Sequence, residues 1–526
     1  MQKKFVTNLI ILLFLNLLIK PFWILVIEPH VQNEVGNAAY GEYFSLFSFS
    51  FLLNILLDFG ITNFNNKNIA QNNHLLTKHF SGLFVLKLIL AVIYILTTIV
   101  IGFIIGYDTR LTKLLLILGF NQFLISLVLY LRSNLQALHF FKVDALLSVL
   151  DRVIMITIVA LMLWTNIFPG RMDVMDFVYA QTVGYFLTAI IAFFAVVRNT
   201  EVMRLRWDLP FSLMILKKSY PFAVLVLLMT FYNRIDSVML ERLLPDGPVA
   251  QTERLKELRD PDLKPNDSQK AERLDLEKKL EHTGSEQAGV YAKAYRMLDA
   301  TNMIAYLFSI LLLPMFSRML KYKESVEQLV KLSFTLLMTV AVVVSVGCVF
   351  YRNEIMVMLY GKDHLGSVTT VFPLLMSCFV AISTTYVFGS LLTANGNLRE
   401  LNIMAFCGMI LNITLNIIFI KFLNLEATGT AIVSLSTQML TAIAQVLIVQ
   451  SKFHFKINWR LLTTLFVYVA GVIALANLTH TYMLRNPDKA AGWLPGFLVM
   501  AASSLAWAFA TRLISIKGMF RIMKYG

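Results

Sequence analysis

Several ionisable side chains lie within long apolar stretches of the chain, where a charge is costly unless it faces a cavity or a partner. These residues are Lys20, Arg234, Asp236, Arg296 and Asp299. On a helix, Arg234 and Asp236 point to different faces and do not simply neutralise each other, whereas Arg296 and Asp299 share a face. Charges at such depth are typical of binding sites for charged ligands and of ion pathways. We therefore interpret these positions as a candidate site, with an intrahelical ion pair as the alternative for Arg296 and Asp299.

Uncharged polar residues accompany these charges. Asn16 lies one helical turn before Lys20, so the two share a face. Tyr291 and Tyr295 share a face just before Arg296, and Gln181 lies in another apolar stretch. Such residues suit contacts to a polar ligand, although amides in membrane helices also hold helices together.

Other charges allow a simpler interpretation. Asp58, Lys87 and Arg132 lie near the expected cytoplasmic ends of helices, where snorkelling of the charged group to the interface is the ordinary explanation. Asp151 and Arg152 interrupt a further apolar stretch. These residues are less specific indicators of a site than the first group.

The elements that must position these residues are membrane helices. Hydrophobic residues make up 57% of the chain, charged residues 15%, and the mean hydropathy is +0.68, which is too apolar for a soluble domain. About 14 stretches are long enough to cross a bilayer. The sequence predicts spans near 5–27, 40–60, 81–105, 113–137, 143–165, 174–197, 219–243, 290–316, 328–350, 367–393, 402–423, 427–450, 461–482 and 493–515.

The net charge of +14 is distributed over short loops on one side of the membrane and does not form one continuous basic face. This distribution argues against nucleic-acid binding and places both termini in the cytoplasm by the positive-inside rule. Lys20 and Pro21 interrupt the first apolar run, so we expect a retained first helix, kinked at Pro21, and not a cleaved signal peptide.

Residues 245–288 are almost wholly polar and fall in a loop assigned to the outside. They hold eight basic and eleven acidic residues, a net charge of −3. Asp267 or Ser268 is expected to begin a helix that runs to about Glu281, with Gly284 ending it. Leu274 and Leu280 give this helix too thin an apolar stripe for a core of its own. We interpret the segment as a solvated hairpin, with a docking surface for a partner as the alternative.

A short motif occurs twice. Gly41-Glu42-Tyr43 and Gly289-Val290-Tyr291 each open a helix just after an outside loop. Corresponding positions of this kind are typical of transporters built from duplicated halves, which bind substrate between the halves.

The sequence contains no catalytic constellation. It has no His-x-x-x-His pair, no phosphate-binding Gly-x-x-x-x-Gly-Lys loop and no Ser nucleophile elbow, so we expect neither an enzyme, nor a cofactor, nor a metal site. Cys348, Cys378 and Cys407 all lie in apolar stretches and are interpreted as small core residues.

Five short motifs resemble a known family. Leu57-Asp58-Phe59-Gly60-Ile61 resembles the end of the second helix in polysaccharide translocases of the MOP flippase superfamily, the Wzx-like or O-antigen flippase group. Residues 232–240 and 288–296 resemble that family's seventh and eighth helices, and residues 392–397 and 412–416 its later landmarks. The likeness covers nearly the whole chain except the polar segment 245–288.

The resemblance implies an all-α membrane protein with two six-helix lobes in a V-shaped arrangement and two additional C-terminal helices. The expected divisions are residues 1–200, 201–450 with the external insertion, and 451–526. The implied function is a flippase that carries an undecaprenyl-diphosphate-linked oligosaccharide from the cytoplasmic to the periplasmic leaflet of a bacterial inner membrane. Transport would proceed by alternating access through a cationic central cavity, for the synthesis of surface polysaccharide. A polysaccharide polymerase or other assembly proteins are the further partners considered.

The resemblance also implies roles for the polar residues. Lys20, Arg234 and Arg296 would bind the diphosphate, Tyr291 and Tyr295 would pack on sugar rings, and Asn and Gln side chains, such as those of Asn16 and Gln181, would meet hydroxyls. Asp236, and with it Asp299, would bind a coupling ion.

Four alternatives remain open. An ion-coupled exporter of small amphiphiles, from the multidrug branch of the superfamily, would share the fold but require an acidic cavity. A flippase for the peptidoglycan-precursor lipid would use a similar cationic site. A membrane-embedded transferase would need an interfacial catalytic cluster, and a structural scaffold would leave the deep charges without a purpose.

Overall fold

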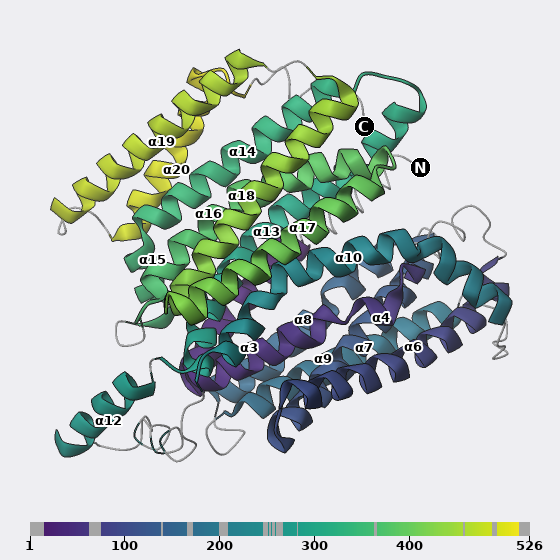
Figure 1. Ribbon diagram of the computed structural model, residues 1–526, viewed down its shortest axis with the longest axis horizontal. Helices are drawn as coiled ribbons and strands as arrows, with labels where there is room; N and C mark the ends of the chain where they lie inside the picture. The colour runs from purple at the N-terminus through teal and green to yellow at the C-terminus, as the bar shows by residue number, and fades with distance from the viewer. Residues whose placement is uncertain are drawn as a thin grey trace. The chain divides into compact units, whose positions relative to one another are not determined.

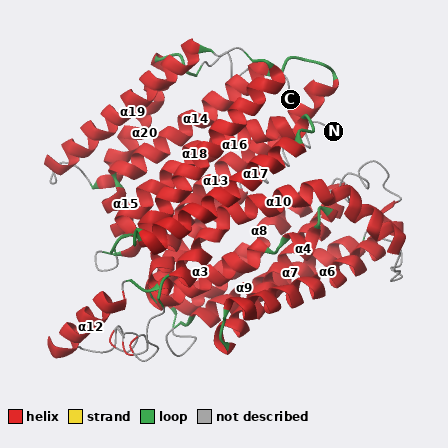
Figure 2. Ribbon diagram, in the orientation of Figure 1, coloured by secondary structure: helices red, strands yellow, loops and turns green. Residues whose placement is uncertain are grey.

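The computed structural model of the protein is built from helices joined by loops (Figure 1). It describes residues 15–62, 75–137, 140–165, 172–198, 209–245, 267–280, 282–361, 365–455, 458–485 and 492–514, and the single positions 251, 254 and 258. Within these residues there is no strand (Figure 2). This confirms the all-helical fold class.

Twelve of the described helices are long and apolar enough to cross a membrane, and they coincide with the third to fourteenth predicted spans. The chain is therefore a multi-pass membrane protein. The helices that follow the first two spans are α6 Leu75–Ile105, α7 Thr109–Ala137, α8 Phe141–Trp164, α9 Val174–Val197, α10 Leu209–Leu243, α12 Asp267–Leu280, α13 Gly284–Lys321, α14 Glu327–Phe350, α15 Arg352–Tyr360, α16 Val368–Ala394, α17 Leu398–Ile417, η3 Ile418–Phe422, α18 Glu426–Phe453, α19 Trp459–Arg485 and α20 Trp493–Ala510.

The first two spans differ from their prediction. Residues 5–14 lie outside the described part of the chain. The first helix contains a π-helical turn, η1 Trp23–Ile27, and continues beyond residue 27 as α2 Glu28–Val35. The second span is broken, because α3 Asn37–Leu52 ends in a turn before the short α4 Ile55–Asp58. The structure has helices in both regions, but average hydropathy does not register a π-helical turn or a local break.

The chain divides into two compact units, Met1–Ala292 and Lys293–Gly526. In the first unit, α7 packs against α3, α6 and α9, while α8 packs on α9 and α10 on α3. Its main apolar core includes Phe80, Leu83, Tyr130, Leu131 and Val196, contributed by α6, α7 and α9. These helices form the frame that holds the charged residues discussed below. The lobe boundaries expected near residues 200 and 450 stay a prediction.

In the second unit, α16 packs between α14 and α18, and α17 packs on α18. The last two helices, α19 and α20, lie side by side and dock on α14 (Figure 1). Val342, Tyr468, Val472 and Met500 are buried in this contact. The C-terminal helix pair is thus an integral part of the second unit.

Apolar side chains also cover outward faces of the helices. On α6, Val92, Leu96, Val100 and Phe103 are exposed and recur at helical spacing along one stripe. A soluble protein would not leave such a continuous stripe in water, whereas hydrocarbon chains of lipids solvate it well. The exposed stripe therefore marks a lipid-facing surface.

The polar segment contains the helix predicted for it, α12, which begins at Asp267 as expected. Its thin apolar stripe does not form a core by itself, because Leu276 and Leu280 are buried together with Leu258, from an earlier part of the segment. Arg254 also donates two hydrogen bonds to the Glu272 carboxylate, at 2.9 and 3.1 Å, which holds the pKa of Glu272 below its usual value. Sequence spacing within one helix could not reveal a contact that a second segment completes.

We expect the polar segment to be dispensable for folding of the membrane helices. The backbone N–H of Gly284 donates to the carbonyl of Pro245 at 3.0 Å, so the two ends of the segment are adjacent. A Gly/Ser linker of about four residues can therefore replace residues 246–282 at little entropic cost. The deletion variant should insert into the membrane at normal yield, with a melting temperature within about 2 °C of wild type.

The control for this deletion is Gly284→Ala. A Cβ atom at Gly284 would lie 2.4 Å from the Glu241 carbonyl oxygen, so this single substitution should lower the melting temperature more than the whole deletion does. Failure of the deletion variant to insert would show that the segment is needed for assembly.

Candidate functional site

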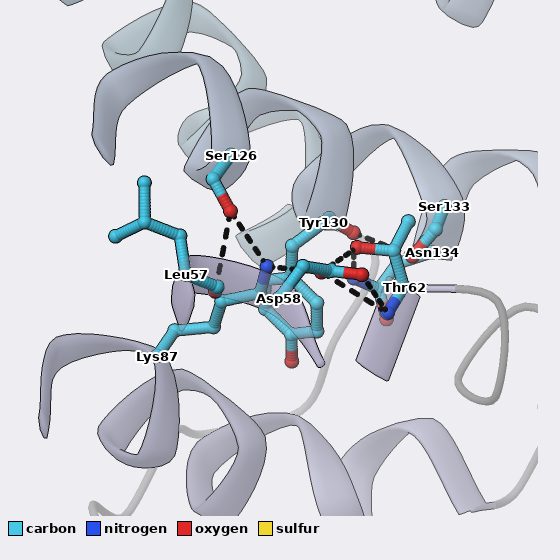
Figure 3. Close-up of polar contacts among 8 residues, drawn as sticks. All are labelled: Leu57, Asp58, Thr62, Lys87, Ser126, Tyr130, Ser133 and Asn134. Carbon is cyan, nitrogen blue, oxygen red and sulfur yellow. Dashed lines mark hydrogen bonds and ion pairs between the residues drawn. The ribbon is translucent and has the colours of Figure 1, made fainter. Parts of the chain in front are cut away.

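Several charged side chains within the apolar helices of the first unit are paired with each other. Arg132 Nε lies 2.7 Å from Asp144 Oδ1, and Gln136 donates to the other carboxylate oxygen at 3.0 Å. Lys87 is fully buried and paired with Asp58 (Figure 3). The snorkelling expected for Lys87 is therefore wrong, because its ammonium is neutralised inside the helix packing.

A different group of side chains lies around the first helix and α8, and we call Lys20, Trp23, Arg152 and Tyr185 the Lys20 group. Lys20 is half-buried and forms no ion pair or hydrogen bond within the described residues. The Arg152 guanidinium carbon lies 5.7 Å from the ring centroid of Trp23 and 5.7 Å from that of Tyr185. Aromatic faces at this distance attract a guanidinium, and Arg152 Nη1 also donates to Met155 Sδ at 3.6 Å.

The Lys20 group has a mixed electrostatic environment. Four charged residues of α7 and α8 act on Lys20, namely Asp151, Arg152, Arg132 and Asp144. Asp144 is held by Arg132, and the contact of Asp151 Oδ2 with Arg152 Nε is long, at 3.7 Å. Arg152 thus lies against two aromatic rings, and Lys20 is near enough to interact electrostatically with it. This arrangement suits an anionic ligand that also carries rings to stack on.

The two predicted amide ligands hold helices together. Asn16 Nδ2 donates to Ser148 Oγ at 2.8 Å, which joins the first helix to α8. Gln181 Nε2 donates to the Tyr43 hydroxyl at 3.0 Å, which joins α9 to α3. Both amides are buried, so these contacts position the Lys20 group from two sides.

Arg234 and Asp236 have separate surroundings in α10, as their spacing predicted. The Arg234 guanidinium carbon lies 5.5 Å from the centroid of the Phe51 ring. Asp236 is buried and accepts a hydrogen bond of 2.9 Å from the Tyr291 hydroxyl, at the start of α13. Tyr291 is only 1% exposed, so in this structure its contact is the carboxylate and not the sugar ring expected from the sequence.

The remaining predicted residues belong to the second unit. Arg296 Nη1 lies 3.2 Å from Asp299 Oδ2, so the two form the intrahelical pair that was the alternative. Tyr295 lies in the same part of α13 and is 8% exposed. The structure therefore does not bring these three residues together with the Lys20 group within one unit.

Both glycines of the repeated Gly-x-Tyr motif lie where two helices meet. A Cβ atom on Gly41 would be 1.9 Å from the Ser285 carbonyl oxygen, and one on Gly289 would be 2.1 Å from the Asn37 carbonyl oxygen. The backbones of α3 and α13 thus touch directly, and Asn37 Nδ2 donates to Glu286 Oε1 at 2.6 Å beside them. The two copies of the motif form the two sides of one contact.

Cysteines and metal ligands offer no further chemistry. In the part of the chain that the structure describes, no group of three or more His, Cys, Asp or Glu side chains could hold a metal ion. Cys348 and Cys378 are buried as expected, but Cys407 is exposed, because its apolar helix face is outward.

Comparison with known sequences decides the family. A family described as "Polysaccharide biosynthesis protein" matches residues 5–320, which is more than half of the chain, and a second family of the same description matches residues 281–369. The chain belongs to the polysaccharide biosynthesis protein family. No curated protein matches it in sequence.

Solved structures show that this family member has the fold of MOP-superfamily transporters. It is similar to the lipid II flippase MurJ in an inward closed conformation, with a TM-score of 0.63 and 14% identity over 96% of this chain and 98% of that chain. It is also similar to an inward-facing multidrug resistance MATE family transporter of the MOP superfamily, with a TM-score of 0.58 and 14% identity over 82% of this chain and 94% of that chain. Identities this low establish the fold alone.

Sequence reasoning missed the buried carboxylate of Glu28, which contacts Trp23 of the Lys20 group. Glu28 is fully buried and accepts hydrogen bonds from Trp23 Nε1 at 2.6 Å and from the Tyr40 hydroxyl at 3.3 Å. It was overlooked because the predicted first span ends at residue 27. The sequence did hold one signal, because Trp23 lies five residues before Glu28 and can donate a hydrogen bond to a buried carboxylate.

Glu28 connects to the Lys20 group through Trp23. The Trp23 ring stacks on Phe177, with 5.6 Å between centroids and 6° between planes, and also lies beneath the Arg152 guanidinium. The Glu28 carboxylate therefore fixes the orientation of the Trp23 indole, and the face of that indole attracts the Arg152 guanidinium. Glu28 with Tyr40 and Asp236 with Tyr291 are two examples of the same arrangement, a buried acid held by a tyrosine of a following helix.

Proposed function

We propose that this protein is a flippase that moves an undecaprenyl-diphosphate-linked oligosaccharide from the cytoplasmic to the periplasmic leaflet of a bacterial inner membrane, for surface polysaccharide synthesis. The family and the transporter fold support movement of a polysaccharide precursor. The observation that carries the choice of substrate is the Lys20 group. Arg152 against two aromatic rings, with Lys20 near it within apolar helices, matches a substrate that joins a diphosphate to sugar rings.

The charge pattern favours this substrate over a cationic amphiphile. Asp58 and Asp144 are occupied by Lys87 and Arg132, so these carboxylates are not available to a cationic ligand. Lys20, by contrast, has no ion pair within the described residues. A diphosphate would complete the coordination of Lys20 and bind in bidentate fashion to Arg152, which replaces the hydration that these cations give up.

The remaining residues receive roles within the same proposal. Arg234 and Arg296 supply further positive charge along the substrate path, and Tyr295 offers a ring to sugars. Asp236 is the first candidate site for a coupling ion, because it is a buried acid that accepts a hydrogen bond from a neutral group, the Tyr291 hydroxyl. Asp299, in the second unit, is a separate candidate. The basic residues of the short loops support cytoplasmic termini.

The decisive experiment uses a strain that lacks this gene. Undecaprenyl-linked oligosaccharides should accumulate with the sugar accessible only from the cytoplasmic side, and surface polysaccharide should be lost. Unchanged lipid-linked sugars together with new sensitivity to cationic amphiphiles would contradict the proposal and favour drug export. Accumulation of the peptidoglycan precursor instead would identify that lipid as the substrate.

We expect Lys20→Met to reduce export in the complemented strain by at least about tenfold, since a charge-assisted contact to phosphate contributes about 1.5–3 kcal/mol. Methionine keeps the length and apolar stem of lysine, so membrane insertion should be normal. Lys113→Met is the matched control, because Lys113 is exposed at the start of α7 and should export normally. Normal export by Lys20→Met would rule out the cationic role of this residue.

A further inference from the structure

The motif Leu57-Asp58-Phe59-Gly60-Ile61 lies where the second membrane span breaks down. The span turns at Leu53 and Asn54, resumes as α4, and then passes through Phe59 and Gly60 with φ angles of 43° and 80°. A left-handed φ at a bulky residue such as Phe59 is unfavourable, so surrounding contacts must hold it in place. Irregular backbone at membrane depth is tolerated only where its polar groups are satisfied within the protein.

Oxygen atoms from three segments meet beside this break (Figure 3). The Asp58 carboxylate accepts hydrogen bonds from the Thr62 hydroxyl and, at 3.3 Å, from the Thr62 backbone N–H. Ser126 Oγ, on α7, donates to the Leu57 carbonyl oxygen at 3.3 Å. Asp58 with Thr62, and Ser126 with the Leu57 carbonyl, thus form two hydrogen-bonded sets at the end of α4, and one point lies between the Asp58 carboxylate and Ser126 Oγ.

The side chain that occupies this point is Lys87, from α6. Its ammonium donates to Asp58 and, at 2.8 Å, to Ser126 Oγ, and the residue is 1% exposed. Asp58 is the one charged group that acts on it within the described residues. Apolar clusters flank the pair, with Leu57, Ala91 and Tyr94 in one of them. The ammonium is thus enclosed, and its charge is balanced by a single carboxylate.

We infer that the break in the second span is a binding site for a small monovalent cation, and that the chain supplies the cation itself as the Lys87 ammonium. Carboxylate, hydroxyl and unwound-backbone carbonyl oxygens at a discontinuous membrane helix are the ligands that bind alkali ions in transporters. Lysine carries a compact point charge with three donors on a flexible stem, so it can fill such a site from a neighbouring helix.

Two consequences follow from the tethered cation. While Lys87 is in place, sodium or potassium from solution has no position to occupy beside Asp58. When the stem and ammonium are removed, the Asp58 carboxylate is left with a space of the shape of the deleted group, and a small ammonium ion of that shape should bind. This inference concerns the site alone and does not depend on which substrate is transported.

The test uses the purified full-length protein and n-propylammonium, which has the atoms that Lys87→Ala deletes beyond Cβ. Lys87→Ala should melt at a lower temperature than wild type, and n-propylammonium chloride should raise its melting temperature in a saturable manner by about 2 °C or more. Sodium chloride at equal ionic strength should do less. Wild type should not respond to n-propylammonium, because its site is occupied.

The control is the double variant Asp58→Asn/Lys87→Ala, which keeps the space but lacks the carboxylate. It should not respond to n-propylammonium. A Lys87→Ala protein that is not stabilised by n-propylammonium, or an equal response in the double variant, would overturn the inference.

A second pair of variants keeps the test decisive if Lys87→Ala does not fold. Lys87→Met fills the space of the stem but has no charge, so it leaves Asp58 without its cation. Adding Asp58→Asn should then raise the melting temperature of Lys87→Met, because a neutral pair needs no cation. If Asp58→Asn lowers it further, or leaves it unchanged, Lys87 is not serving as a cation for Asp58 and the inference fails.

Discussion

Gly41→Ala should reduce glycan export to less than about a tenth of wild type while the protein still inserts into the membrane. The new methyl group would lie 1.9 Å from the Ser285 carbonyl oxygen and 2.6 Å from the Gly289 nitrogen. Both atoms are backbone atoms of α13, so no side-chain rotation can make room. The first turns of α3 and α13 must therefore separate, and any step of the transport cycle that needs their contact becomes unfavourable.

The physical reason for a large effect is that two glycines and the Asn37–Glu286 hydrogen bond lie in this contact. A single methyl group blocks the backbone approach, and separation of the helices also breaks the Asn37–Glu286 hydrogen bond. Shifting a two-state equilibrium by about 1.4 kcal/mol changes populations tenfold, and overpacking against backbone commonly costs 1–3 kcal/mol. Gly289→Ala should give the same result, because its methyl group would meet the Asn37 carbonyl oxygen from the other side.

Export and cross-linking should be measured together. In a Cys407→Ser background, cysteines at positions 37 and 286 should cross-link readily, and Gly41→Ala should slow that cross-linking. Gly119→Ala is the matched control, because the nearest atom to its new methyl group is Tyr94 Cε1 at 3.6 Å, an ordinary contact. Normal export and unchanged cross-linking in Gly41→Ala would show that the α3–α13 contact plays no part in transport.

Neutralising Asp236 should abolish export without unfolding the protein. Asp236→Asn retains an oxygen that accepts the hydrogen bond of the Tyr291 hydroxyl, so the α10–α13 contact survives. It loses the negative charge that would bind a coupling ion. We expect export to fall at least about a hundredfold, which corresponds to about 2.8 kcal/mol, with a melting temperature close to that of wild type.

Two further variants separate ion binding from helix packing at Asp236. Tyr291→Phe removes one hydrogen bond, worth about 1 kcal/mol, and should reduce export only about fivefold, since the carboxylate remains. Glu28→Gln is the matched control, because Glu28 is an equally buried acid held by aromatic donors, and we assign it the structural task of orienting Trp23. Equal losses in Glu28→Gln and Asp236→Asn would contradict a special role for Asp236, and normal export by Asp236→Asn would remove it as a coupling site.

Some of the site was accessible from the sequence because it depends on spacing along one helix. The different faces of Arg234 and Asp236 and the shared face of Arg296 and Asp299 follow from helical geometry, and the structure agrees with both. The Gly-x-Tyr repeat was also visible, with both copies in the opening turns of helices. What the repeat does was not visible, because its two copies are 248 positions apart and only folding brings them into contact.

Other residues were misread because their partners are on different helices. Lys87 near an expected helix end looked like a snorkelling residue, but Asp58 and Ser126, 29 and 39 positions away, enclose it. Glu28 lies one residue beyond the predicted first span, yet Trp23 and Tyr40 donate hydrogen bonds to its carboxylate inside the packing. In each case the charge of the residue suggested an exposed environment, whereas the residue is buried. The cost of burying a charge depends on its partner, and average hydropathy does not take partners into account.

The sequence by itself determined that this protein is an all-helical membrane protein, where most of its spans lie, and that charges occur within them. It could do so because a membrane span must satisfy its backbone internally and present apolar side chains over a fixed length, and both requirements are written locally. Only the tertiary structure decided which of those charges are neutralised, which hold aromatic rings, and that two distant glycines meet. Those outcomes depend on how each helix is rotated about its axis against its neighbours, and that rotation is set by packing between segments far apart in the chain.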